Sequence, residues 1–136
     1  MSIPEQPQKP KDLSSPETLI QMITGFWISQ AIYAVAKLGI ADLVKEGPKP
    51  CEALAQATGM HPQTLYRLLR ALASVGVFRE GEEGRFGLTP LAEYLQTGVT
   101  GSLRAFAIMQ SELQYRAYGE VLHSVKTGGK RTDGVW

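Results

Sequence analysis

Apolar residues recur at helical spacing through the first third of the chain, and no charged residue occurs from residue 18 to residue 36. A serine followed by proline and glutamate marks a helix start, and the glycine at 39 marks an end. The pattern predicts a helix over residues 16–38. Its apolar stripe consists of Leu19, Ile23, Phe26, Trp27, Ile32 and Val35.

This predicted helix is apolar on most of its circumference and must therefore be buried on most of it. The uncharged run reaches the minimum length of a membrane span, but Gln21, Thr24, Ser29 and Gln30 lie inside it. We therefore expect no membrane, and interpret the segment as a dimerisation helix with one face on its own core and one on a partner. A central core helix within a monomer is the alternative.

Two short amphipathic segments surround a tight turn in the middle of the chain. The first covers residues 52–58, and the second follows His61-Pro62 with a leucine stripe at 65, 68, 69 and 72. Gly59 supplies the left-handed position of the turn, and Met60 is expected to plug it. The spacing predicts a helix-turn-helix.

A small hairpin is predicted next. Residues 77–79 and 85–88 can pair across the Gly-Glu-Glu-Gly of 81–84. Further helices are expected after Thr89-Pro90, at about 102–109 and at about 112–126. The predicted fold class is therefore all-α (mainly helical): a winged helix-turn-helix with a small two-stranded β-wing and flanking dimerisation helices.

The charge distribution argues against DNA binding. A recognition helix and wing need basic residues for bases and phosphates. Here the helix offers Arg67 and Arg70, whereas the wing carries glutamates at 80, 82 and 83. The net charge of +1 adds no basic field. We expect no nucleic-acid partner, and a winged-helix DNA-binding transcription regulator stays the alternative.

No catalytic or metal-binding group of residues stands out. His61 and His123 lack a second ligand at metal spacing, and Cys51 lacks a partner base. No glycine-rich loop after a strand and no βαβ pattern offers a nucleotide or adenosyl site. We predict no catalytic, cofactor-binding or metal residues in this chain. One cysteine and no apolar signal segment favour a cytoplasmic protein.

Four stretches, taken in order, resemble the N-terminal region of the S-adenosylmethionine-dependent O-methyltransferases that act on small molecules. The resemblance covers about Ser14 to Gly128. The stretches are GFWISQAIYAVAKLGIADLV, PCEALAQATGMHPQTLYRLLRALASVGVFRE, GRFGLTPLAEYL and EVLHSVKTG. In that family the region is a winged-helix-like dimerisation domain, and a Rossmann-like catalytic domain follows it.

The resemblance implies a homodimer in which the first helix packs across the interface and closes the partner's acceptor pocket. The residues we expect at the dimer interface or the acceptor-pocket wall are Met22, Phe26, Trp27, Gln30, Tyr33 and Met109. S-adenosylmethionine and a small-molecule acceptor are implied only for a full-length enzyme. None of the catalytic domain's motifs lies in this sequence.

The expected organisation is a flexible arm over 1–13, a winged-helix-like dimerisation domain over 14–128 and a tail over 129–136. The predicted function is that of a dimerisation domain of an O-methyltransferase, not catalytic by itself. Whether the chain counts as an enzyme is left open, since the implied parent is a methyltransferase and the catalytic domain is expected to be absent. A stand-alone protein–protein interaction module is a second alternative.

Overall fold

The computed structural model describes residues 13–129, and within them it confirms a mainly helical fold with a small antiparallel sheet. The predicted arm and tail lie outside the described residues, except for one residue of each. The helices are α1 (Pro16–Ile23), α2 (Gly25–Leu38), α3 (Ile40–Leu43), α4 (Cys51–Thr58), α5 (Pro62–Ala73), α6 (Pro90–Glu93), α7 (Arg104–Met109), α8 (Tyr115–Tyr118) and α9 (Val121–Thr127). The strands are β1 (Lys49–Pro50), β2 (Arg79–Glu80) and β3 (Arg85–Gly87).

Helices α4 and α5 form the predicted helix-turn-helix. Gly59 ends α4 with φ of +72°, in the left-handed region where glycine carries no steric penalty. His61 caps α5, because its Nδ1 accepts a hydrogen bond from the backbone N–H of Thr64 at 3.3 Å. The prediction that Met60 plugs the turn is wrong, because this residue is 43% exposed.

The sheet has three strands in the order β1-β3-β2, one more than the sequence predicts. The predicted hairpin is present, with Glu80 opposite Phe86. The added strand pairs antiparallel with β3, which places Pro50 opposite Arg85. Phe86 is fully buried, and its ring meets that of Tyr66 on α5 edge-on at 5.8 Å. The wing is therefore fixed to the second helix of the motif.

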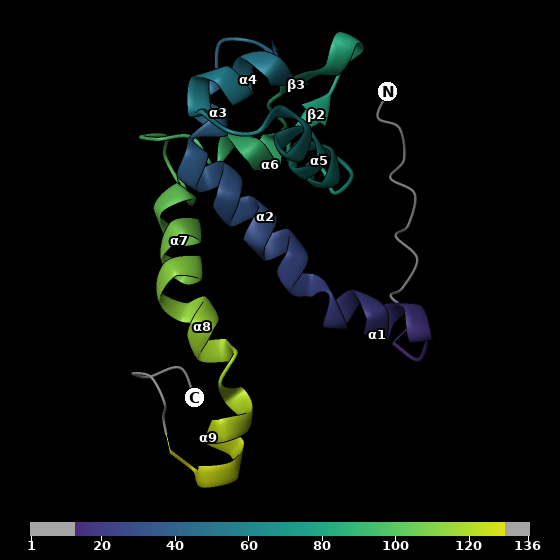
Figure 1. Cartoon of the computed structure of the whole chain (residues 1–136), viewed down its shortest axis with the longest axis vertical. Helices are drawn as coiled ribbons and strands as arrows, with labels where there is room; N and C mark the ends of the chain where they lie inside the picture. Colours follow the sequence, from purple (N-terminus) through teal and green to yellow (C-terminus); the bar gives the residue numbers. More distant parts are fainter. Residues whose placement is uncertain (1–12, 130–136) are drawn as a thin grey trace, which may run out of the picture.

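Two helical limbs leave this winged-helix body in diverging directions, as Figure 1 shows. One limb is α2 continued by α1, and the other is α7 continued by α8 and α9. The single helix predicted over 16–38 is interrupted at Thr24, whose φ and ψ of −95° and 6° are not helical. Its hydroxyl donates to the carbonyl of Ile20 at 2.9 Å, which gives that helix-end carbonyl a partner.

The second limb differs from the sequence prediction in where it breaks. A π-helical turn, η2 (Gln110–Gln114), joins α7 to α8, where a break after residue 109 is predicted. The interruption falls instead at 119–120, between α8 and α9. The glycine at 119 is a weak helix former, which explains the position of the break.

The core lies where the base of α2 meets the winged helix. The residues with the largest fully buried side chains are Phe78, Phe86, Ile40, Leu54, Leu69, Leu72, Val35 and Val44. They come from α2, α3, α4, α5 and the sheet region. The buried residues of α2 all lie at or beyond its midpoint and are Ala31, Val35 and Ala36.

Arg104, at the start of α7, forms hydrogen bonds with the C-terminal end of α2. Its Nε donates to the carbonyl of Ala36 at 2.7 Å, and its Nη1 donates to the hydroxyl of Thr97 at 2.7 Å. Thr97 in turn donates its backbone N–H and hydroxyl to the carboxylate of Asp42, at 2.8 and 2.6 Å. Partial burial raises the pKa of Asp42, but these hydrogen bonds and the charge of Arg104 outweigh it and lower the pKa overall.

The hydroxyl of Thr89 forms hydrogen bonds both with the segment that leads into the wing and with α6. It donates to the carbonyl of Gly76 at 2.7 Å and accepts from the backbone N–H groups of Phe78 and Ala92, at 3.3 and 3.2 Å. Phe78 is buried and has φ of +70°, a conformation that costs a non-glycine residue about 1–2 kcal/mol. The hydroxyl therefore both caps α6 and holds a strained residue in place.

We expect Thr89→Val to lower the free energy of unfolding by about 1–3 kcal/mol, because it removes the cap and leaves two N–H donors without this partner. Thr89→Ser keeps the hydroxyl and is the matched control. Chemical denaturation of the three chains measures the effect. Equal losses in the valine and serine variants would contradict it.

Candidate functional site

Large apolar side chains are exposed along α1 and the start of α2. We call this surface the α1–α2 patch. It comprises Leu19, Ile20, Met22, Ile23, Phe26 and Trp27, which are 47–68% exposed. Phe26 and Trp27 meet edge-on at 6.0 Å between ring centroids, so they form a single aromatic cluster. Monomeric proteins seldom expose so large a group of apolar residues unless it is a binding surface.

An apolar groove of about 660 Å³ lies beside this patch, between α2, α6 and α7. Its α2 edge follows helical spacing, so these side chains share one face of the helix. The lining residues are Gly25, Ile28, Ser29, Ile32, Val77, Leu91, Tyr94, Leu95, Leu103, Phe106, Ala107 and Gln110. None of them is charged at neutral pH.

A polar seam joins α2 to the π-helical turn on another face of α2. Glu112 accepts a hydrogen bond from the hydroxyl of Tyr33 at 2.8 Å and forms an ion pair with Lys37 at 2.8 Å. Gln30 donates to the hydroxyl of Ser111 at 3.3 Å. Figure 1 shows the C-terminal end of α2 and the start of α7 near each other at the body. The contacts of the seam connect the two limbs at the π-helical turn that follows α7.

The contacts of the seam shift the pKa values of Tyr33, Lys37 and Glu112. Each shift stabilises the protonation state that the side chain has at neutral pH. The hydrogen bond to Glu112 raises the pKa of Tyr33 and of Lys37. Lys37 and then Tyr33 lower the pKa of Glu112. At neutral pH the phenol is therefore neutral, the ammonium is charged and the carboxylate is charged.

The six residues predicted for an interface or pocket wall occupy different environments. Met22, Phe26 and Trp27 lie in the patch with their side chains open to solvent. Gln30 and Tyr33 are half-buried and are engaged within the chain by the polar seam. Met109 ends α7 and is 39% exposed. The exposure of Met22, Phe26 and Trp27 leaves these three side chains available for contact with a partner.

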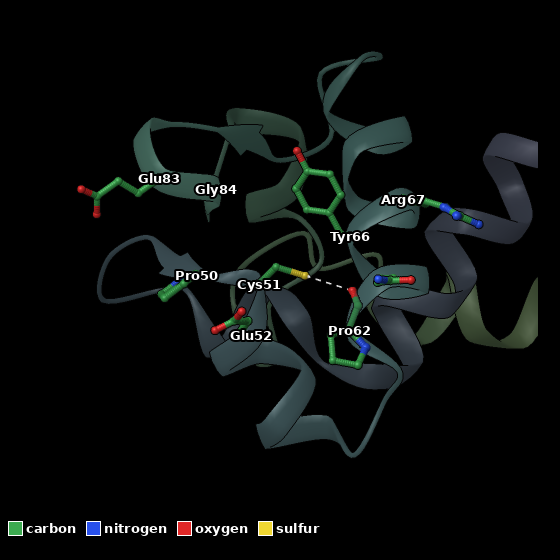
Figure 2. Close-up of a pocket in the computed structure, with 9 residues that line it drawn as sticks. Pro50, Cys51, Glu52, Pro62, Tyr66, Arg67, Glu83 and Gly84 are labelled. Atoms are coloured by element: carbon green, nitrogen blue, oxygen red, sulfur yellow. Dashed lines mark hydrogen bonds between the residues drawn. The ribbon is translucent and has the colours of Figure 1, made fainter.

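A second cleft, of about 610 Å³, lies between α4, α5 and the wing. Figure 2 shows the thiol of Cys51 directed to the carbonyl of Pro62, at 3.7 Å. Burial raises the pKa of this thiol, and the charges of Glu52 and Glu80 raise it further. The thiol is thus protonated at neutral pH, unlike a nucleophilic cysteine. No group of three metal-binding side chains occurs within residues 13–129.

Helix α5 and the wing, which would face DNA in a DNA-binding winged helix, lie at the same end of the molecule. Arg67 and Arg70 are exposed on α5, as expected, but the exposed tip of the wing carries Glu82 and Glu83. Glu83 lies 3.9 Å from Arg85 and so offsets part of the positive charge of the wing. This surface has mixed charge, which gives no track for a phosphate backbone.

Residues 16–38, taken together, are long and apolar enough by composition to cross a membrane. This criterion rests on length and composition alone, and 11% of the apolar window is buried within the chain. The residues of the α1–α2 patch lie inside this segment.

The sequence pattern missed the groove and the seam. Both depend on contacts between segments about 80 residues apart, such as Gln30 with Ser111 and Tyr33 with Glu112. The apolar residues in 91–106 were a partial signal, but spacing alone does not reveal which helix they approach.

Comparison with known proteins gives a consistent answer. The model of the O-methyltransferase dimerisation domain family matches residues 20–98. Phenazine O-methyltransferase PhzM of Lysobacter antibioticus is 56% identical over 110 residues, which make up 81% of this chain and 32% of that protein. The chain thus spans about a third of the length of this relative.

Solved structures agree in fold. The crystal structure of LaPhzM matches with a TM-score of 0.81 at 55% identity, covering 83% of this chain and 34% of that one. CalO1, a methyltransferase in calicheamicin biosynthesis solved in its SAH-bound form, matches with a TM-score of 0.70 at 31% identity, covering 85% and 34%. With a winged-helix body, an exposed apolar patch and these matches, the chain belongs to the O-methyltransferase dimerisation domain family, whose parent enzymes are S-adenosylmethionine-dependent methyltransferases.

Proposed function

We propose that this chain forms a homodimer through the α1–α2 patch and so serves as the self-association module of an O-methyltransferase that acts on small molecules. The observation that carries the proposal is the exposure of six large apolar side chains on one limb. A side chain of this size contributes roughly 1.5–3 kcal/mol when it is removed from water. A second copy of the same patch is a partner of matching chemistry.

The polar seam gives this module a second role in the proposal. Gln30 and Tyr33 follow the patch along α2 and offer an amide and a neutral phenol, and Met109 at the end of α7 offers a thioether. Such a mixture suits the wall of a pocket for a small, largely apolar acceptor with a few polar groups. The relative named as a phenazine O-methyltransferase supports an acceptor of this class.

The methyl donor is proposed only for an enzyme that also has a catalytic domain. An adenosyl cofactor of this kind is held at the carboxyl ends of parallel strands, beside a glycine-rich turn. In residues 13–129 the strands are antiparallel and two or three residues long. The described residues therefore do not fit the donor.

We also propose a cytoplasmic location, consistent with a single free cysteine.

We expect the chain to sediment as a dimer at tens of micromolar and Trp27→Asp to shift it toward monomer, with a dissociation constant raised at least about tenfold. A charge at a buried, uncharged contact is costly to desolvate. Met60→Asp is the matched control, because Met60 is also exposed but lies in the turn between α4 and α5. Sedimentation equilibrium measures all three chains. A monomeric wild type, or unchanged association in Trp27→Asp, would count against the proposal.

We expect no binding of S-adenosylmethionine to this chain in isothermal titration calorimetry at ligand concentrations up to about 1 mM. The reason is the lack of a parallel-strand site in residues 13–129. A full-length family member, titrated under the same conditions, serves as the positive control. A dissociation constant in the micromolar range for this chain would refute the expectation.

A further inference from the structure

The π-helical turn η2 departs from regular helix geometry in the middle of the second limb. Its hydrogen bond runs from the backbone N–H of Tyr115 to the carbonyl of Gln110, five residues back instead of the four of an α-helix. Gln114, at the end of the turn, has φ of −108°, whereas a regular α-helix has about −63°. Such a turn accommodates one residue more than an α-helical turn does. It is rare in proteins and is often found at functional sites.

The contacts of the polar seam reach the second limb within this turn. Ser111 accepts a hydrogen bond from the amide of Gln30 at 3.3 Å. Glu112 accepts a hydrogen bond from the hydroxyl of Tyr33 at 2.8 Å and pairs with the ammonium of Lys37 at 2.8 Å. The three partners are three and four residues apart in sequence, so they lie along one face of α2. Both contacts of Glu112 involve its charged carboxylate, which makes them the stronger contacts of the seam.

The extra residue decides which side chains follow these two along the limb. In an α-helix, residues four positions apart lie on the same side, so Tyr115 and Arg116 would follow Ser111 and Glu112. Through the π-helical turn the spacing becomes five, and Arg116 and Ala117 follow instead. Burial agrees with the second arrangement, because Ala117 is 3% exposed whereas Tyr115 is 40% exposed. The turn thus places a small side chain on the covered side of the limb and keeps a large one off it.

We propose that the turn is a two-state register element, which the seam holds in its π-helical form. In the other state the turn is α-helical, and α8 is rotated about its axis by about 100°, the angle per residue of an α-helix. This rotation brings Tyr115 to the side that Ala117 occupies now. The direction of the exposed side chains beyond the turn, such as Tyr118, therefore depends on the contacts of Glu112. The inference uses contacts within one chain and does not rest on the homodimer.

The distance between two spin labels on the two limbs tests this register. In a Cys51→Ser background, one label replaces Gln21 on α1 and the other Arg116 on α8, both exposed and on the diverging limbs of Figure 1. Double electron–electron resonance is measured with an excess of unlabelled chain, so that only distances within one chain contribute. We expect Glu112→Ala to change the mean distance by several ångströms, since side-chain tips lie about 5 Å from a helix axis. Leu113→Ala, 70% exposed in the same turn and outside the seam, is the matched control and should leave the distance unchanged.

Deletion of one residue from the turn is the second measurement, and it separates a change of register from a general disturbance of the limb. Because the π-helical turn holds one extra residue, deletion of Leu113 should convert it to an α-helical turn and leave the orientation of α8 unchanged. We therefore expect the deletion to keep the distance of the parent chain and to restore that distance in the Glu112→Ala chain. An unchanged distance in Glu112→Ala overturns the proposal, as does a changed distance that the deletion does not restore.

Discussion

The rest of the structure depends on how α2 is buried. This helix is almost entirely apolar, but the other elements of the chain pack against only one half of it. The C-terminal half is buried against the winged helix through Val35 and Ala36, each 1% exposed. The N-terminal half extends beyond the body, and Phe26 and Trp27 are about half exposed or more. Water cannot satisfy such a surface, so the free energy of the apolar residues is recovered only by contact with another molecule. The winged helix is thus a base that holds α2 and presents its free end.

Polar contacts fix the direction in which α2 leaves that base. Arg104 donates to carbonyls at the end of α2 and connects them to Thr97 and Asp42. Glu112, in the π-helical turn that follows α7, contacts Tyr33 and Lys37 of α2. The two limbs are therefore oriented by charge-assisted hydrogen bonds that are independent of the apolar patch. A binding surface preset in this way loses little conformational entropy when a partner binds.

The sequence predicted those parts of the fold that local chemistry specifies. Ser15, His61 and Thr89 cap helices where their positions indicate, and Gly39 and Gly59 end helices in the left-handed conformation. The family was identified from the order of these same segments.

What the sequence did not predict depends on contacts between distant residues. Strand β1 exists only because Lys49 and Pro50 pair with β3, across more than 30 residues. Local spacing indicates a break after residue 109, but a π-helical turn at 110–114 continues the second limb. In this turn Ser111 and Glu112 contact α2. Candidate interface residues could be chosen from their apolar character, but their division between patch and seam required the fold.

The emission of Trp27 as a function of chain concentration tests the central claim most directly, because it reports whether water reaches the patch itself. A Trp136→Phe chain leaves Trp27 as the only indole. If two copies bury the patch, the emission maximum is blue-shifted at tens of micromolar and moves to the red on dilution, in step with the dissociation measured by sedimentation. An emission maximum that stays at the position of a solvent-exposed indole at all concentrations would contradict the account.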